Sequence, residues 1–452
     1  MAEPAHLRTG SLSFIEVLAT SVALIGPSMT PILIAPYMYA NAGNGAWLAY
    51  AFGGAMLVVV ALNINQFARR SSAAGSMYGY VADHLGPFLG AIGGWTLLWA
   101  YGFVAAAVLG AMALFVGMLL ADAGLRGVSG VAAYVTFALA VAAAAWQAAY
   151  RGVQISAIVM LVLEAISVAI ICWLIVVVLV HHGPSVDAAQ LTVRGGFPGG
   201  VGLAIATAVF SYVGFESATA FGGEAARPLV TIPRAVIGSV LFVSAFFIVA
   251  IYAEIVGMQH ASTSLDKQTF PLGTLVALFD VGYLRVPLTI GALCSAFSVC
   301  LACITTAGRI AYAMALAGIL PPWFASIEPK HATPHVAVTT VTAITAIVAV
   351  ASLGAGVAPI DVFNNCGTLS SFGFIVIYAL ISVAAAIYVN RLGEMRSIDF
   401  LLAVAALGLL LVPAITLFYP VPPPPQRWFA YYFLAFLVAG CGWFAIGRRA
   451  AA

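Results

Sequence analysis

Hydrophobic residues occur along the chain in long runs that short polar segments separate. A helix needs about 20 predominantly apolar residues to cross the hydrocarbon core of a bilayer. Twelve runs are long enough, at residues 14–40, 45–67, 88–121, 129–149, 153–180, 199–222, 233–257, 286–317, 335–355, 361–390, 398–419 and 427–447. This pattern predicts an all-α integral membrane protein with twelve transmembrane helices.

Two of these runs contain residues that interrupt a helix near its middle. The first run reads "ALIGPSMTPILIA", with Gly26, Pro27 and Pro31 in the centre, and the sixth reads "FSYVGFES" around Gly214. Proline removes a backbone donor, glycine permits non-helical backbone, and exposed polar backbone is not tolerated in lipid. Interrupted helices at corresponding places in two halves indicate a transporter binding site. We therefore expect helices one and six to be broken around a substrate.

The charges are few and unevenly placed. Charged residues make up 7% of the chain, against about 25% in an ordinary soluble protein, so the composition does not favour nucleic-acid binding. With the N-terminus inside, twelve of the 17 Lys and Arg residues fall in inner loops and tails. The positive-inside rule therefore predicts that both termini are cytoplasmic.

Three segments carry a resemblance to a known family. They are "RRSSAAGSMYGYVADHLGPFLGAIGGW" (69–95), "GFESATAFGGEAARPLVTIPRAV" (214–236) and "AGRIAYAMALAGILPPWFASIEPKHATPHVAV" (307–338). In order and spacing they resemble permeases of the amino acid–polyamine–organocation (APC) superfamily. The resemblance implies a LeuT-type 5+5 inverted-repeat fold and alternating access. It divides the chain into a tail (1–13), a transport core (14–390, with repeats at about 14–180 and 199–390) and two peripheral helices (398–447).

The expected substrate site lies between the two breaks. In the first break, amides and hydroxyls can receive a substrate carboxylate, although the two prolines contribute no N–H. Aromatic residues beside the second break can cover the substrate or stack on a cation. The candidate substrate-binding residues are Gly26, Ser28, Met29, Thr30, Tyr101, Phe210, Ser211, Tyr212, Gly214, Phe215 and Glu216.

Buried acids and hydroxyls are candidates for ion coupling. The resemblance places Glu164 where proton-coupled relatives often carry a lysine, so Glu164 is the leading candidate for a proton carrier. Its charge could instead attract sodium or a substrate ammonium group, with Ser295 and Ser298 completing an ion site. Glu16 and Glu254 fall near span ends, and we expect water to reach both.

Charged residues on the inner face suggest a gate. Glu224, Arg227, Arg234, Arg69 and Arg309 are predicted to lie on that face together with Arg70, and ion pairs there could hold a closed conformation together. The alternative is that these are ordinary anchoring charges of inner loops.

Together these features predict a secondary transporter of an amino acid or related organic amine in the cytoplasmic (inner) membrane, driven by protons or by exchange. The alternatives are a nutrient sensor without net flux and a sodium-coupled carrier of another substrate. No enzymatic nucleophile–base cluster, metal site or cofactor motif is evident. The expected partners are a small molecule, a proton or sodium, and lipid, in a monomer or homodimer.

Overall fold

The computed structural model describes residues 13–70, 77–125, 130–151, 157–183, 188–192, 200–221, 225–331 and 333–451. Within these residues, twelve helical segments are long and apolar enough to cross a membrane. The predicted all-α architecture and the number of spans are thereby confirmed. The division into two repeats of five spans stays a prediction.

The elements follow one another along the chain with short connections. The α-helices are α1 (Phe14–Ile25), α2 (Met29–Leu33), α3 (Ala35–Ala42), α4 (Ala46–Ala68), α5 (Met77–Leu85), α6 (Pro87–Asp122), α7 (Val131–Tyr150), α8 (Ala157–His182), α9 (Val201–Tyr212), α10 (Pro228–Met258), α11 (Pro271–Leu278), α12 (Arg285–Leu316), α13 (His335–Gly354), α14 (Pro359–Arg391), α15 (Ser397–Thr416) and α16 (Phe429–Ala451). Short 3₁₀ turns include η2 (Ala188–Leu191), η3 (Phe215–Phe221), η4 (Leu265–Lys267) and η7 (Gln426–Trp428).

Two differences from the sequence prediction concern the connections. The segment between the second and third predicted spans contains helix α5, for which we predicted no element from the sequence. Met77, Tyr78, Tyr80 and Val81 of this helix are buried, so its apolar face packs on the bundle. Helix α10 begins at Pro228 and continues through Pro233, the residue at which we expected the seventh span to start. From the sequence alone, the helix could begin at either Pro228 or Pro233, because proline is favoured in the first turn of a helix.

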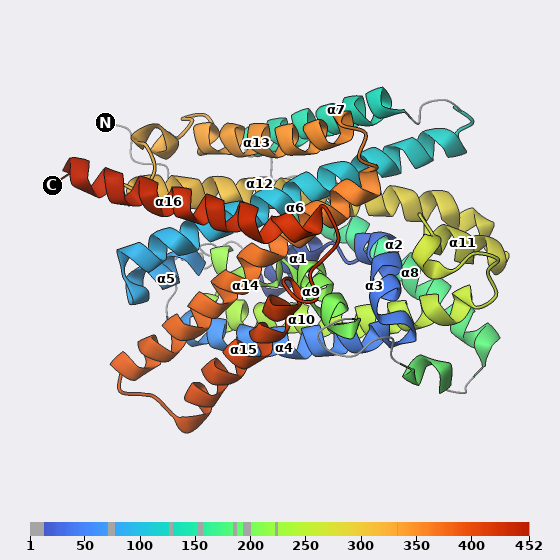
Figure 1. Cartoon of the computed structure of the whole chain (residues 1–452), viewed down its shortest axis with the longest axis horizontal. Helices are drawn as coiled ribbons and strands as arrows, with labels where there is room; N and C mark the ends of the chain where they lie inside the picture. The colour runs from blue at the N-terminus through green and yellow to red at the C-terminus, as the bar shows by residue number, and fades with distance from the viewer. Residues whose placement is uncertain are drawn as a thin grey trace.

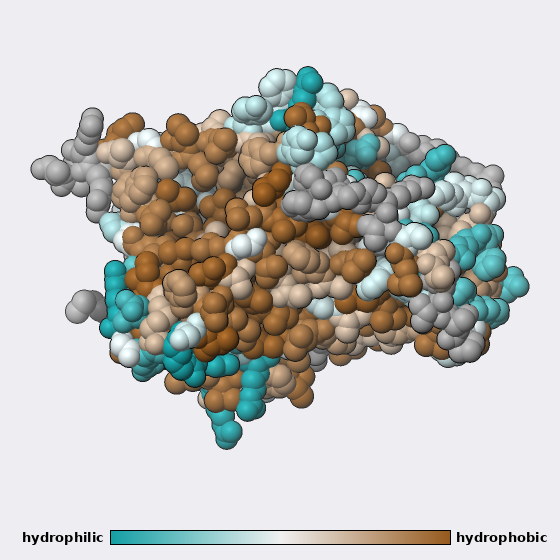
Figure 2. All heavy atoms as spheres, turned by 60° about the horizontal axis from the view of Figure 1, so that its bottom comes forward, coloured by the Kyte–Doolittle hydropathy of each residue, from teal (hydrophilic) through white to brown (hydrophobic). Residues whose placement is uncertain are grey.

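Several long helices, among them α6, α12 and α16, lie side by side and roughly horizontal in Figure 1, whereas α14 and α15 run obliquely. Helix α6 packs along α12 and α14, while α7 and α13 pair at the top of the view and α15 and α16 lie on the outside. Only 28% of the α15 span and 22% of the α16 span are buried. Figure 2 shows a broad hydrophobic surface with hydrophilic residues gathered toward its ends, as expected of a protein embedded in lipid.

Candidate functional site

Helix α1 ends in the middle of the first span because of Gly26. Its φ of 65° lies in the left-handed region, and Met29 donates to the Gly26 carbonyl as helicity resumes in α2. A Cβ at this position would lie 2.7 Å from Val299 Cγ2 on α12. Both the backbone angle and the space therefore require glycine here.

Helix α9 ends in a similar way at Tyr212, before Gly214. Gly214 has a φ of 115°, and η3 begins at the next residue. A Cβ on Gly214 would lie 2.9 Å from the Leu24 carbonyl carbon and 3.0 Å from the Ile25 nitrogen. The end of α9 thus packs directly against the end of α1, and the two interrupted segments meet inside the protein.

Glu164 of α8 reaches the start of α2. The Ser28 backbone N–H and hydroxyl both donate to Glu164 Oε1, at 2.9 and 2.8 Å. Ser295 of α12 also lies beside this carboxylate and next to Gly26. Glu164, Ser28 and Ser295 are at most 3% exposed. Three predicted residues from distant segments therefore come together around one buried carboxylate.

Glu216 of η3 forms a second buried carboxylate centre. The Tyr101 hydroxyl on α6 donates to Oε1 at 2.7 Å, and the Tyr378 hydroxyl on α14 donates to Oε2 at 3.2 Å. The Gly214 backbone N–H also donates to Oε2, at 3.2 Å. With three donors and 1% exposure, Glu216 is fixed between the helix ends and the long helices α6 and α14.

A cavity of about 240 Å³ lies between α3, α9, α14 and the connection between α15 and α16. Phe210 lines it and packs on Phe363 of α14, with ring centroids 5.3 Å apart. The lining includes no charged side chain, and its hydrogen-bonding groups include Tyr37, Asn41, Thr207, Asn364, Thr368 and Gln426. The cavity can accept a small molecule that is neutral overall and has polar groups.

The other predicted binding residues are also buried, with different neighbours. The Tyr212 hydroxyl donates to the Tyr50 carbonyl on α4, and Ser211 lies 3.2 Å from the Tyr50 hydroxyl. Phe215 packs on Tyr378, and Ser298 donates to the Cys294 carbonyl of its own helix. Met29 and Thr30 are buried in α2.

The predicted gate residues are only partly brought together. Glu224 lies outside the described residues. Arg69 and Arg234 line one shallow groove between the end of α4 and the start of α10. Arg227 and Arg309 are exposed, and no described ion pair involves any of these four arginines.

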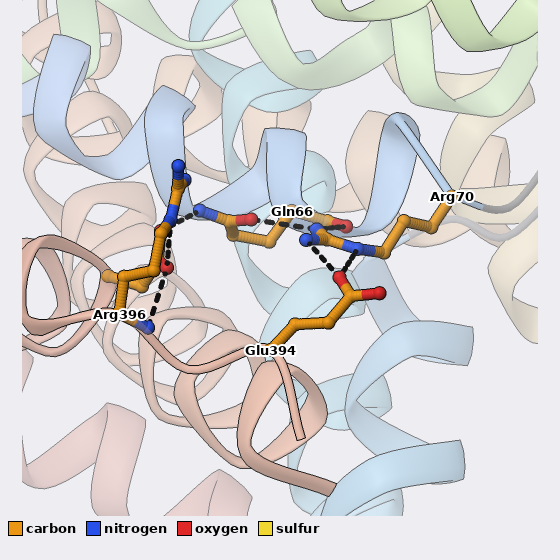
Figure 3. Close-up of polar contacts among 5 residues, drawn as sticks. Gln66, Arg70, Glu394 and Arg396 are labelled. Atoms are coloured by element: carbon orange, nitrogen blue, oxygen red, sulfur yellow. Dashed lines mark hydrogen bonds and ion pairs between the residues drawn. The ribbon is translucent and has the colours of Figure 1, made fainter. Parts of the chain in front are cut away.

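A polar cluster around Arg70 joins the elements at this end, and the sequence predicted none of the partners of Arg70 in it. Arg70 forms an ion pair with Glu394 at 2.8 Å and donates to Gln66, as Figure 3 shows. Gln66 in turn donates to Asp399 at 2.9 Å, and Asp399 pairs with Arg396. The cluster links the end of α4 to the connection between α14 and α15.

Tyr378 was not singled out from the sequence, and Glu254 was misjudged. Tyr378 lies in an apolar run without a helix breaker, so only its hydroxyl distinguished it from a packing residue. Glu254 was expected to be within reach of water, and this was wrong, because it is 1% exposed. Its position near a span end gave no information about the neighbouring helices that cover it. Among the described residues, no three His, Cys, Asp or Glu side chains form a group that could hold a metal ion.

Comparison with known proteins places this helical bundle in a family. The family model "Amino acid permease" matches residues 22–446. The chain belongs to the amino acid permease family. The expected APC resemblance is thereby confirmed, and so is a multi-pass membrane protein.

Individual relatives of this permease cover most of its length. It is 23% identical over 430 residues to the branched-chain amino acid permease BcaP of Bacillus subtilis, covering 90% of the chain and 83% of the relative. It is 26% identical to the methylthioribose transporter of the same organism, over 79% and 76% of the two chains. The crystal structure of MhsT in complex with L-phenylalanine matches with a TM-score of 0.61 and 15% identity, over 91% of this permease and 100% of MhsT. The permease therefore shares the fold of that structure.

Proposed function

We propose that this permease is a secondary active transporter that carries an amino acid or related organic amine across the cytoplasmic membrane by alternating access. The observation that carries the proposal is the contact between the ends of α1 and α9, with buried carboxylates on either side. Such helix ends provide backbone groups that can bind the polar parts of a substrate. Family membership and the amino acid permease BcaP support an amino acid as substrate.

The substrate is proposed to reach this site through the neutral cavity. Phe210 lines the cavity and lies four residues before Gly214. A zwitterion suits this path, because it is polar but neutral overall and meets no charged lining. Its ammonium group would then approach Glu216, and its carboxylate would approach Ser28.

Coupling is proposed to arise from competition for Ser28. Both Ser28 donors are directed at Glu164 in this conformation. A protonated Glu164 accepts hydrogen bonds more weakly than the carboxylate does, because hydrogen bonds to an ionised acceptor are about twice as strong. Proton binding to Glu164 would release the Ser28 N–H and hydroxyl for a substrate carboxylate. Proton and substrate would then bind together.

A sodium-coupled carrier, a carrier of another substrate and a sensor without flux would each give different results in transport measurements. A sodium-coupled carrier would require sodium rather than a pH gradient, with Glu164 and Ser295 among its ligands. One relative, the methylthioribose transporter of Bacillus subtilis, is named for a substrate that is not an amino acid. A sensor would bind substrate without moving it. Substrate binding, flux and ion dependence must therefore be measured separately.

The first experiment measures thermal unfolding of the purified protein with a panel of amino acids, amines and sugar derivatives. A ligand at 100 times its Kd stabilises the folded state by about 2.7 kcal/mol. We expect a neutral amino acid to raise the melting temperature, and its decarboxylated amine to have little effect. If neither an amino acid nor an amine raises it while a sugar derivative does, the proposed substrate class is wrong.

The same ligand then tests coupling in Glu164→Gln. We expect uptake by wild-type proteoliposomes to depend on a proton gradient, and binding by Glu164→Gln to become nearly independent of pH. Glu16→Gln is the matched control, because glutamine preserves the capping box with Ser13 and this acid lies far from Ser28 in the first span. Identical pH profiles for wild type and Glu164→Gln would exclude Glu164 as the proton carrier without excluding transport.

A further inference from the structure

Glu254 on α10 is a buried acid to which the proposed mechanism assigns no role. The residue is 1% exposed, and both carboxylate oxygens lack a hydrogen-bond partner among the described residues. An ionised carboxylate without partners is strongly disfavoured in an apolar environment. Glu164 and Glu216, by contrast, each receive two or more donors. Glu254 therefore differs from Glu164 and Glu216, because their carboxylates are hydrogen-bonded and its carboxylate is not.

The neighbours of Glu254 connect it to Tyr50 on α4. The Tyr50 ring packs on Phe247 of α10, with ring centroids 5.2 Å apart. Glu254 follows Phe247 by seven residues, so the two share one face of the helix, and side chains tilt toward the helix N-terminus. The Glu254 carboxyl group is thus directed back toward Tyr50. When ionised, Glu254 is near enough to interact electrostatically with the Tyr50 hydroxyl.

From Tyr50 a chain of hydrogen bonds leads through Ser211 to the backbone of Thr207 at the cavity. The Tyr50 hydroxyl lies 3.2 Å from Ser211 Oγ on α9, and Ser211 donates to the Thr207 carbonyl at 3.4 Å. Thr207 lines the cavity together with Phe210. A hydroxyl group can donate one hydrogen bond while it accepts another, so Tyr50 and Ser211 can pass a proton along.

No described charged group neutralises Glu254 from the elements packed against this end of α10. Val178 of α8 lies beside Gly257, which places the end of α8 here. The titratable or charged side chains on these elements include Tyr50 on α4, Tyr212 on α9, Tyr252 on α10, His260 after it, Tyr37 on α3, His181 and His182 on α8, and Asp266 and Lys267 in η4. None forms an ion pair with Glu254.

We infer that Glu254 is a second proton-binding site, which exchanges its proton with the cavity by way of Tyr50 and Ser211 when a water molecule bridges its carboxyl group to the Tyr50 hydroxyl. In the conformation described here Glu254 is the neutral acid. When it releases the proton, the carboxylic O–H bond breaks and its electron pair remains on the carboxylate. The proton passes over the bridging water and the two hydroxyl groups to water in the cavity, which becomes hydronium. The inference goes beyond the proposed function, because that function gives Glu254 no role. Its test requires no substrate.

Infrared spectroscopy of the full chain in lipid vesicles tests this inference. The C=O stretch of a protonated carboxylic acid is followed as pH is raised, in wild type and in Glu254→Gln. We expect a band at neutral pH that Glu254→Gln lacks and that disappears from wild type at alkaline pH. Glu394→Gln is the control, since its side chain is 56% exposed and should contribute no such band at neutral pH.

Two further variants keep the test decisive. If Glu254→Gln does not give folded protein, Glu254→Asp retains the acid and should move the band rather than abolish it. Tyr50→Phe keeps the ring but removes the hydroxyl, and we expect the band to remain while its response to a pH jump slows severalfold. Spectra of wild type and Glu254→Gln that coincide at every pH would overturn the inference. So would loss of the wild-type band on addition of sodium at constant pH.

Discussion

At the scale of single residues, Glu216 is held by groups from three separate parts of the chain. Tyr101, Tyr378 and Gly214 each supply one donor to its carboxylate. Hydrogen bonds to a charged group contribute about 1.5–3 kcal/mol, and an unsatisfied buried group is penalised further. The two tyrosines therefore fix the position of Glu216 as well as stabilise it.

Removing these hydroxyl groups should destabilise the protein in a defined order. We expect Tyr101→Phe to lower the melting temperature more than Tyr378→Phe, because its hydrogen bond is shorter (2.7 against 3.2 Å). The loss should amount to about 1–3 kcal/mol for Tyr101→Phe. Tyr431→Phe, at a side chain that is 63% exposed, is the control and should melt like wild type. An unchanged melting temperature in Tyr101→Phe would show that the tyrosine does not stabilise Glu216.

At the scale of elements, the contact between α1 and α9 depends on Gly214. Its φ of 115° lies in the left-handed region, and the backbone of Leu24 and Ile25 comes so close that there is no room for a side chain. Because Leu24 and Ile25 on the other side of the contact present main-chain atoms, they cannot yield by changing a side-chain rotamer. The relative position of the two helix ends is therefore set by this one glycine.

Gly214→Ala should consequently separate the two helix ends. Strained backbone and overpacking each cost about 1–3 kcal/mol, so we expect a lower melting temperature and loss of ligand binding. Gly442→Ala in α16 is the matched control, because its Cβ would meet open space and its φ is not positive. Melting curves that coincide for Gly214→Ala and Gly442→Ala would contradict this account of the contact.

At the scale of the whole molecule, the cluster around Arg70 joins elements that lie far apart in the sequence. Its ion pair connects the end of α4 with the connection between α14 and α15 (Figure 3). The two side chains are 26% and 56% exposed, so solvent screens the attraction. Such a pair is suited to a contact that opens and closes, since it contributes little more than about 1 kcal/mol.

A series of charge-swap variants measures the coupling free energy between Arg70 and Glu394. We expect Glu394→Lys to lower the melting temperature slightly, because it places two positive charges together. The double variant Arg70→Glu with Glu394→Lys should recover most of that loss. The coupling free energy from the double-mutant cycle should be about 0.2–1 kcal/mol and should shrink at high salt. A coupling of zero at low salt would show that the pair is not formed in solution.

The sequence by itself determined the features that depend on local chemistry. Runs of apolar residues define the spans, because each must cross the same thickness of hydrocarbon. Gly26 and Gly214 were recognisable as positions where helical backbone can end, because glycine alone tolerates the angles they adopt. Glu164 and Glu216 were recognisable as functional candidates, because carboxyl groups at bilayer depth are rare.

Only the tertiary structure decided how these features are combined. Ser28 and Glu164 are 136 residues apart, and their pairing depends on how α8 is rotated and placed against α2. The same is true of Tyr378. In the sequence it is a single hydroxyl-bearing residue in an apolar run, and only the orientation of α14 in the fold directs its hydroxyl at Glu216. Glu254 is buried because neighbouring helices cover it, although its place near a span end suggested exposure. Hydrophobicity and length fix where a helix crosses the membrane, whereas packing against neighbouring helices fixes the direction in which each side chain points.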